Sequence, residues 1–126
     1  RLIQVIRNPF DPISLMMVRG GRSFANSIDH YFAACETRAR IRRTEGGAIL
    51  PVRYEAFVGD PIAGLTSACA FLGVDADRGY LDACASIVRP EPDRGREMVR
   101  WTRPWIDDVE RRLARFDFLE GYSYES

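Results

Sequence analysis

The sequence predicts an α/β fold built from short parallel strands with a predominantly helical remainder. Residues Leu2 to Ile6 form a short, apolar, partly β-branched run, which is typical of a buried parallel strand. Residues Ile49 to Tyr54 (ILPVRY) form a second such run, in which Pro51 indicates an edge strand or pairing at one end only. Most of the remaining chain carries apolar residues at helical spacing.

A sharp turn and a helix are expected directly after the first strand. Asn8-Pro9 ends the strand, because proline lacks a backbone N–H and restricts the residue before it. Asp11 is expected to cap the following helix, and Pro12 suits its first helical position. The segment is therefore predicted to be a strand–turn–helix unit.

Two side chains of this unit are candidate phosphate ligands. Arg7 leaves the strand at its carboxyl end, where open α/β sheets bind ligands, and arginine can hold a phosphate through two parallel hydrogen bonds. Ser14 is expected in the first helical turn, among unpaired backbone N–H groups that favour anions. The competing interpretation is an ordinary strand–turn–helix with a surface arginine, since such loops are common.

Further helices follow from apolar periodicity and end signals. A loop from Arg19 to Asn26 precedes a helix that Ser27 is expected to cap, and Gly46-Gly47 ends that helix. Asp60-Pro61 predicts the start of another helix, which Gly73 ends. The residues expected to face inward are Ile28, Tyr31, Phe32, Cys35 and Ala39 in the first of these helices, Ile62, Leu65, Cys69 and Leu72 in the second, Tyr80, Leu81, Cys84 and Ile87 in a helix from 75 to 88, and Ile106, Val109, Leu113 and Phe116 in a helix that Pro104 opens.

Composition excludes several classes of protein. The 126 residues are 46% apolar, which suffices for a folded core. The formal net charge is zero, which argues against a general binder of nucleic acid or membrane surfaces. All eighteen basic residues are arginine, a composition typical of GC-rich bacterial genomes, so this chain supplies no catalytic or phosphate-loop lysine.

Three further features of the sequence bear on where the protein is located and on whether the chain is part of a longer protein. Cys35, Cys69 and Cys84 are widely spaced in helical patterns and are expected to be reduced core residues of a cytoplasmic protein. No signal peptide, membrane span or cluster with metal-ligand spacing is visible. The chain opens inside a strand without a methionine, so we expect it to be part of a longer protein.

Several separate segments carry one resemblance. Val5 to Asp11 resembles the "RNP-x-D" turn of sulfotransferases that use 3′-phosphoadenosine-5′-phosphosulfate (PAPS), and Arg53 to Pro61 resembles their "RYEDL…DP" segment. Cys69 to Gly73 is similar to the "FLG" that follows, Arg96 to Trp101 to a later arginine-to-tryptophan stretch, and Gly121-Tyr122 to the "GY" near the family's end. In order and spacing these motifs match the C-terminal half of the family's P-loop-like, three-layer fold.

The resemblance implies roles for five residues. In the family, the arginine of the RNP turn and a serine in the next helix bind the 3′-phosphate, which points to Arg7 and Ser14. The serine of relatives lies one position later than Ser14. The tyrosine of the RYE segment lies near the nucleotide, which points to Tyr54, and a late arginine-rich loop closes over the 3′-phosphate, which points to Arg94 and Arg96.

The resemblance assigns no catalytic residue to this chain. The family's phosphosulfate loop and its catalytic histidine or glutamate precede the matching region, and no G-x-x-x-x-G-K-[ST] loop is present. His30, the only histidine, is expected to be packed or solvent-facing, and Glu55 beside Arg53 is expected to be an ion-pair partner. Trp101 and Trp105 are interpreted as core residues rather than as the lining of an acceptor pocket.

The chain is therefore expected to form part of an enzyme. Residues 1–126 would form the C-terminal portion of a single sulfotransferase-like domain that moves a sulfuryl group from PAPS to a hydroxyl or amine acceptor and releases 3′,5′-adenosine bisphosphate. By itself this portion is expected to be inactive. The alternatives are another P-loop-type nucleotide enzyme, such as a kinase, and a non-catalytic helical interaction module. The expected partner is a small-molecule or biosynthetic acceptor, with no metal, nucleic acid or membrane, and the oligomeric state stays open.

Overall fold

A computed structural model describes residues 1–126 and is mixed α/β, with one small parallel sheet and a largely helical remainder. The chain divides into two compact units. Unit 1 comprises residues 1–6 and 45–92, and unit 2 comprises residues 7–44 and 93–126. The predicted α/β class is confirmed at this level, while the assignment of the whole chain to one sulfotransferase-like domain stays a prediction.

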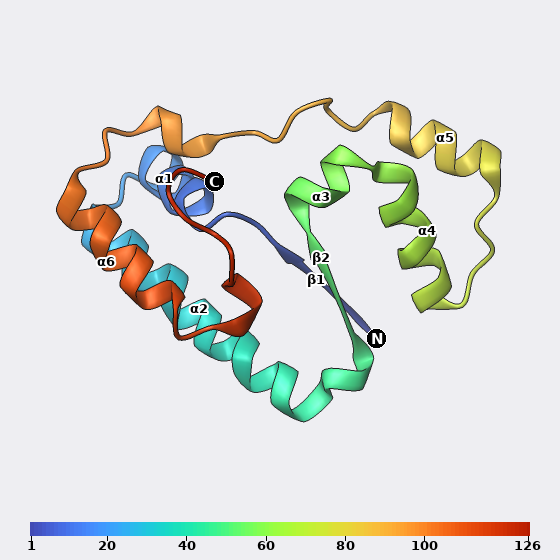
Figure 1. Cartoon of the computed structure of the whole chain (residues 1–126), viewed down its shortest axis with the longest axis horizontal. Helices are drawn as coiled ribbons and strands as arrows, with labels where there is room; N and C mark the ends of the chain where they lie inside the picture. Colours follow the sequence, from blue (N-terminus) through green and yellow to red (C-terminus); the bar gives the residue numbers. More distant parts are fainter. The chain divides into compact units, whose positions relative to one another are not determined.

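The sheet belongs to unit 1 and has two strands (Figure 1). Strand β1 (Leu2–Ile6) pairs in parallel with β2 (Ile49–Arg53), and Ile6 lies opposite Arg53, so the two strands end level with each other. The prediction of short parallel strands is confirmed. The second strand is one residue shorter than expected, because Tyr54 already begins a helix.

The expected burial of β1 is wrong for most of the strand. Ile6 is buried, but the large side chains of Leu2, Ile3 and Val5 are exposed. Within unit 1, β1 has a single strand neighbour, and the helices contact the sheet mainly at β2. A single neighbouring strand leaves much of the apolar surface of β1 in contact with water.

One helix of unit 1, which follows a short helix that the sequence does not predict, begins and ends where the sequence predicts. Helix α3 (Tyr54–Gly59) is followed by α4 (Pro61–Leu72), whose first turn is capped by Asp60, as its Oδ1 accepts a hydrogen bond of 3.0 Å from the Ala63 N–H. Gly73 has a φ of 73°, the left-handed conformation that a helix-ending glycine adopts. Of the predicted inward face of α4, Cys69 is buried, but Leu72 is exposed.

Helix α5 (Arg78–Ser86) is shorter than the predicted helix from 75 to 88, because the Asp77 side chain caps it by accepting from the Tyr80 N–H. Leu81 is buried, as expected. The inward placement of Tyr80 and Ile87 is wrong: they are 60% and 84% exposed, and Ile87 lies beyond the end of the helix.

Unit 2 is built from α1 (Phe10–Gly20), α2 (Phe24–Glu45) and α6 (Arg103–Leu113), with the 3₁₀ turns η2 (Gly95–Met98) and η3 (Asp117–Leu119). Helix α2 runs alongside α6 (Figure 1), and an ion pair between Asp29 and Arg112 joins them. The predicted inward stripe of α6 is confirmed. The buried apolar core of this unit comprises Phe10, Ile13, Ile28, Tyr31, Phe32, Cys35, Trp101, Ile106, Val109, Leu113, Phe116, Phe118 and Leu119.

The connection between α1 and α2 is tighter than predicted. Only residues 21–23 lie between the helices, and Gly21 ends α1 with a φ of 61°. The cap of α2 is Ser23, whose Oγ accepts a hydrogen bond of 3.2 Å from the Asn26 N–H. The assignment of the cap to Ser27 is wrong, since that residue is fully buried inside the helix.

All three cysteines are free thiols. None of the helices combines the length and the apolar composition that crossing a bilayer requires.

Candidate anion-binding site around Arg7

The turn after β1 is organised by Asn8, which is buried. Its side-chain Oδ1 accepts from the Phe10 N–H at 3.2 Å, and its backbone carbonyl accepts from the Asp11 N–H at 3.1 Å. Asn8 therefore holds the turn into α1, whose N-cap residue is Pro9, and the predicted cap by Asp11 is wrong. Pro12 occupies the third helical position rather than the first, because α1 begins at Phe10.

The first turn of α1 offers few backbone donors to an anion. The N–H groups of Phe10 and Asp11 both bond to Asn8, Pro12 has none, and the Ile13 N–H donates to the Pro9 carbonyl at 3.2 Å. The expectation that Ser14 lies among unpaired N–H groups is therefore wrong. An anion at this end of α1 would depend on side chains instead.

Asp11 forms a buried ion pair with Arg96. Nε and Nη2 of Arg96 lie 2.9 Å from Oδ1 and Oδ2 of Asp11, and the Arg96 backbone N–H donates to the same carboxylate at 3.0 Å. The two residues are only 2% and 4% exposed. This bidentate geometry satisfies the carboxylate and joins η2 to α1.

The remaining nitrogen of Arg96 holds the end of the chain. Its Nη1 donates to the Tyr124 carbonyl at 2.6 Å and reaches the Ser123 carbonyl at 3.5 Å. The Asn8 Nδ2 donates to the same Ser123 carbonyl at 2.9 Å. Arg96 thus links α1, η2 and the last residues of unit 2, and the phosphate contact expected of it stays a prediction.

Arg7 and Arg94 are more exposed than Arg96, with side chains 20%, 50% and 5% exposed. Arg7 donates through Nη2 to the Asp93 carbonyl, and its guanidinium lies 3.8 Å from the Asp11 carboxylate and 3.7 Å from that of Asp93. Arg94 follows Asp93 in the chain, and its Nη1 lies 3.7 Å from Glu97 Oε1. The contact between Arg7 and residue 93 thus brings two predicted ligands, from segments far apart in sequence, to the same end of α1.

The Ser14 hydroxyl lies in the core of unit 2. It donates to the Phe10 carbonyl at 2.8 Å and accepts from the Trp101 indole N–H at 2.9 Å. The Trp101 ring packs edge-on against Phe10 and Phe24, so its interpretation as a core residue is confirmed. A phosphate contact by Ser14 stays a prediction, and it would require both of these bonds to be exchanged.

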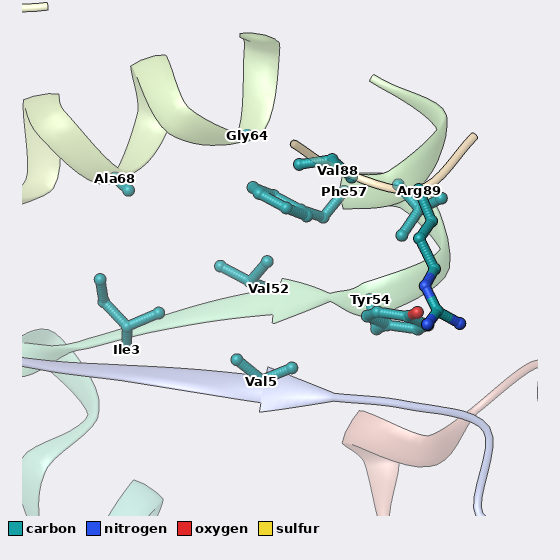
Figure 2. Close-up of a pocket in the computed structure, with 10 residues that line it drawn as sticks. Ile3, Val5, Val52, Tyr54, Phe57, Gly64, Ala68, Val88 and Arg89 are labelled. Carbon is teal, nitrogen blue, oxygen red and sulfur yellow. The ribbon is translucent and has the colours of Figure 1, made fainter. Parts of the chain in front are cut away.

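Tyr54 belongs to unit 1, where it begins α3 and lines a largely apolar pocket (Figure 2). Glu55 lies in the first turn of the same helix. His30 is exposed on α2, which agrees with its interpretation as a solvent-facing residue. The chain contains no cluster of residues that could hold a metal ion.

The sequence reasoning missed the acidic and amide partners of this site. The sequence predicts a capping role for Asp11 and indicates no contact between Asp93 and Arg7. A local signal existed for one of them, since Asp11 follows Arg7 by four residues. Pairing of Asp11 with Arg96, 85 residues away, had no local signal.

Comparisons of the chain with protein-family models, with curated proteins and with solved structures found no match.

Proposed function

We propose that this chain supplies the 3′-phosphate side of the nucleotide site in a PAPS-dependent sulfotransferase. The enzyme would move a sulfuryl group from PAPS to a hydroxyl or amine acceptor and release 3′,5′-adenosine bisphosphate. The observation that carries the proposal is the position of Arg7, directly after the carboxyl end of β1 and beside the loop that bears Arg94. That is where an open α/β sheet offers a ligand its side chains.

The electrostatics around Arg7 support an exchangeable anion site. The carboxylates near Arg7 and Arg94 lie at 3.7–3.8 Å, beyond ordinary hydrogen-bond distance. Only the Arg94–Glu97 pair is solvent-exposed on both sides, with side chains 50% and 68% exposed, and such a pair contributes at most about 1 kcal/mol. A phosphate dianion that accepts two short, charge-assisted hydrogen bonds from a guanidinium would displace the Asp93 and Glu97 carboxylates, while Asp11 stays bound to Arg96. The Arg96–Asp11 pair would stay intact underneath and hold the loop.

The proposal assigns different tasks to the other predicted residues. Arg94 would contact the phosphate directly, and Arg96 would position the loop that carries Arg94. Ser14 would hold Trp101 rather than the phosphate, given where its hydroxyl lies. Tyr54 keeps the role near the nucleotide that the family resemblance implies. The proposed setting is a cytoplasmic protein with a three-layer, P-loop-like domain, of which residues 1–126 form the C-terminal portion.

Isothermal titration calorimetry with two nucleotides tests the role of Arg7. Arg7→Ala should weaken binding of 3′,5′-adenosine bisphosphate by about 1.5–3 kcal/mol, the magnitude of a hydrogen bond to a charged group. It should leave binding of adenosine 5′-monophosphate, which lacks the 3′-phosphate, unchanged. Ser14→Ala should change neither affinity by more than about 0.5 kcal/mol if the hydroxyl only holds Trp101.

Arg115→Ala is the matched control, since Arg115 is an exposed arginine of the same unit that pairs with Glu36. It should bind both nucleotides like the wild type. An equal loss of affinity for both nucleotides in Arg7→Ala would show that Arg7 does not recognise the 3′-phosphate. An unchanged affinity for the bisphosphate would show that Arg7 does not bind the nucleotide.

A further inference from the structure

Unit 1 contains a cavity of ≈390 Å³ between its sheet and its helices (Figure 2). The side chains of Ile3, Val5 and Val52 project into it from the two strands, and α4 borders it at Gly64 and Ala68. This volume falls in the range of pockets that bind small molecules. The walls are almost entirely apolar, so a ligand would bury hydrocarbon or an aromatic ring there.

The packing of Phe57 against α4 shapes one wall of this cavity. Figure 2 shows the Phe57 ring between Gly64 and the strand residue Val52. A Cβ atom at position 64 would lie 2.5 Å from Cδ2 of that ring, so any larger residue would force the ring to move. The cavity is therefore built by a specific close approach of α3 and α4.

The polar groups of the cavity gather at one end. Figure 2 shows the Arg89 guanidinium beside the Tyr54 ring, at the end of β2. Arg89 is exposed and forms no ion pair or hydrogen bond within the chain. Its charge is therefore not compensated by a carboxylate of the protein, in contrast to Arg78 of the same unit, which pairs with Asp82.

We propose that this cavity binds a small apolar organic monoanion, a carboxylate with an alkyl or aryl tail. The tail would occupy the apolar walls, and the carboxylate would meet Arg89 and the Tyr54 hydroxyl. One cation matches one negative charge, while a phosphate dianion would leave a charge uncompensated against apolar walls. The proposal does not rest on the sulfotransferase assignment, because it is carried by the apolar walls and Arg89 of unit 1; Tyr54 is the one residue that both proposals use.

The test compares octanoate with octanamide, a neutral probe of nearly the same shape. Calorimetry on the whole chain should show one octanoate bound per chain and about fivefold weaker binding of octanamide, the scale of about 1 kcal/mol for a partly exposed charge contact. Arg89→Gln should remove that preference, while the control Arg78→Gln should keep it. Ala68→Leu, which extends a side chain into the cavity from a helix that accepts leucine, should weaken both probes about tenfold or more.

Circular dichroism and the thermal midpoint of each variant report whether the fold is retained. Equal affinity of the wild type for octanoate and octanamide would overturn the anion preference. Octanoate binding that Ala68→Leu leaves unchanged would overturn the site. If Ala68→Leu instead abolishes binding of 3′,5′-adenosine bisphosphate and octanoate does not bind, the cavity belongs to the nucleotide and the proposal fails, while the sulfotransferase proposal stands.

Discussion

Arg7 and Arg96 carry the same guanidinium group, but their environments assign them different tasks. The Arg96 side chain is 5% exposed and is surrounded by a carboxylate and two backbone carbonyls. The Arg7 side chain is 20% exposed, and the carboxylates of Asp11 and Asp93 lie 3.8 and 3.7 Å from its guanidinium. A buried guanidinium with short bonds stabilises the fold, whereas a partly hydrated one can exchange its partner for a ligand.

The Asp11–Arg96 pair should be costly to break. Asp11→Asn leaves the Arg96 charge buried without a counter-charge, which is expected to lower the free energy of unfolding by about 3–5 kcal/mol. Asp107→Asn should lower it by about 1 kcal/mol or less, since its partner Arg103 and its own side chain are largely exposed. Urea unfolding followed by circular dichroism measures both values.

The double variant Asp11→Leu/Arg96→Met distinguishes the cost of an uncompensated charge from the cost of losing the other hydrogen bonds of Arg96. It replaces both charges by apolar groups and should recover most of the loss seen in Asp11→Asn. If the double variant is as unstable as Asp11→Asn, the bonds of Arg96 to Ser123 and Tyr124 matter more than its charge balance.

Two buried side chains of α2, Tyr31 and Cys35, predict that the protein becomes less stable at alkaline pH. Burial raises the pKa of the Tyr31 phenol far above its usual value of 10.0 and raises the pKa of the Cys35 thiol above 9.0. The folded chain therefore keeps protons that the unfolded chain loses above about pH 9, so the free energy of unfolding falls as the pH rises above about 9.

Urea midpoints between pH 7.5 and 10.5 should show this decline, at up to about 1.4 kcal/mol per pH unit for each group. Tyr31→Phe should make the decline shallower, because it removes one of the two groups. A midpoint that stays level up to pH 10.5 would contradict the assignment.

At the scale of elements, the close approach of η2 to α1 depends on Gly95. A Cβ atom at position 95 would lie 3.0 Å from the Asp11 carbonyl oxygen and 3.2 Å from Leu15 Cγ. Gly95→Ala should therefore push η2 away from α1 and destabilise the protein by about 1–3 kcal/mol, the cost of overpacking. The control is Gly20→Ala in the same unit, where the new Cβ meets only Arg22 side-chain atoms at 3.6 Å or more.

Thermal unfolding of both glycine variants gives the comparison. If Gly95→Ala unfolds at the wild-type temperature, the contact between η2 and α1 is less rigid than the structure describes. Weaker binding of 3′,5′-adenosine bisphosphate in Gly95→Ala would extend the Arg7 proposal, because the same turn carries the loop with Arg94.

At the scale of the whole molecule, the two units differ in how they are stabilised. Unit 2 has a core of aromatic and aliphatic side chains around α1, α2 and α6. The sheet of unit 1 has a single ladder, and three large apolar residues of β1 are exposed. Because two-stranded sheets are marginally stable, we expect local opening of β1 and β2 at lower free energy than in α1 and α6.

Hydrogen exchange followed by mass spectrometry checks this difference. Peptides that cover β1 and β2 should exchange faster than peptides that cover α1 and α6 under native conditions. Equal protection of both sets, with a single unfolding step, would show that the whole chain opens cooperatively.

Local chemistry in the sequence determined much of the element structure. Asp60 and Gly73 bound α4 as predicted, because a cap and a left-handed glycine act within a few residues of the helix end. The stripe on α6 and the parallel pairing of the strands also followed from apolar spacing and order. These features involve neighbours along the chain, or a periodicity that is visible in it.

Only the tertiary structure decided which polar side chains are buried and which apolar ones are exposed. The partner of Asp11 lies 85 residues away, and that of Ser14 lies 87 residues away. No local pattern distinguishes a capping Asp11 from one that pairs with Arg96, or a phosphate-binding Ser14 from one that holds Trp101. The same applies to Leu2, Ile3 and Val5, whose apolar character predicts burial, while their exposure depends on how many neighbours the sheet supplies.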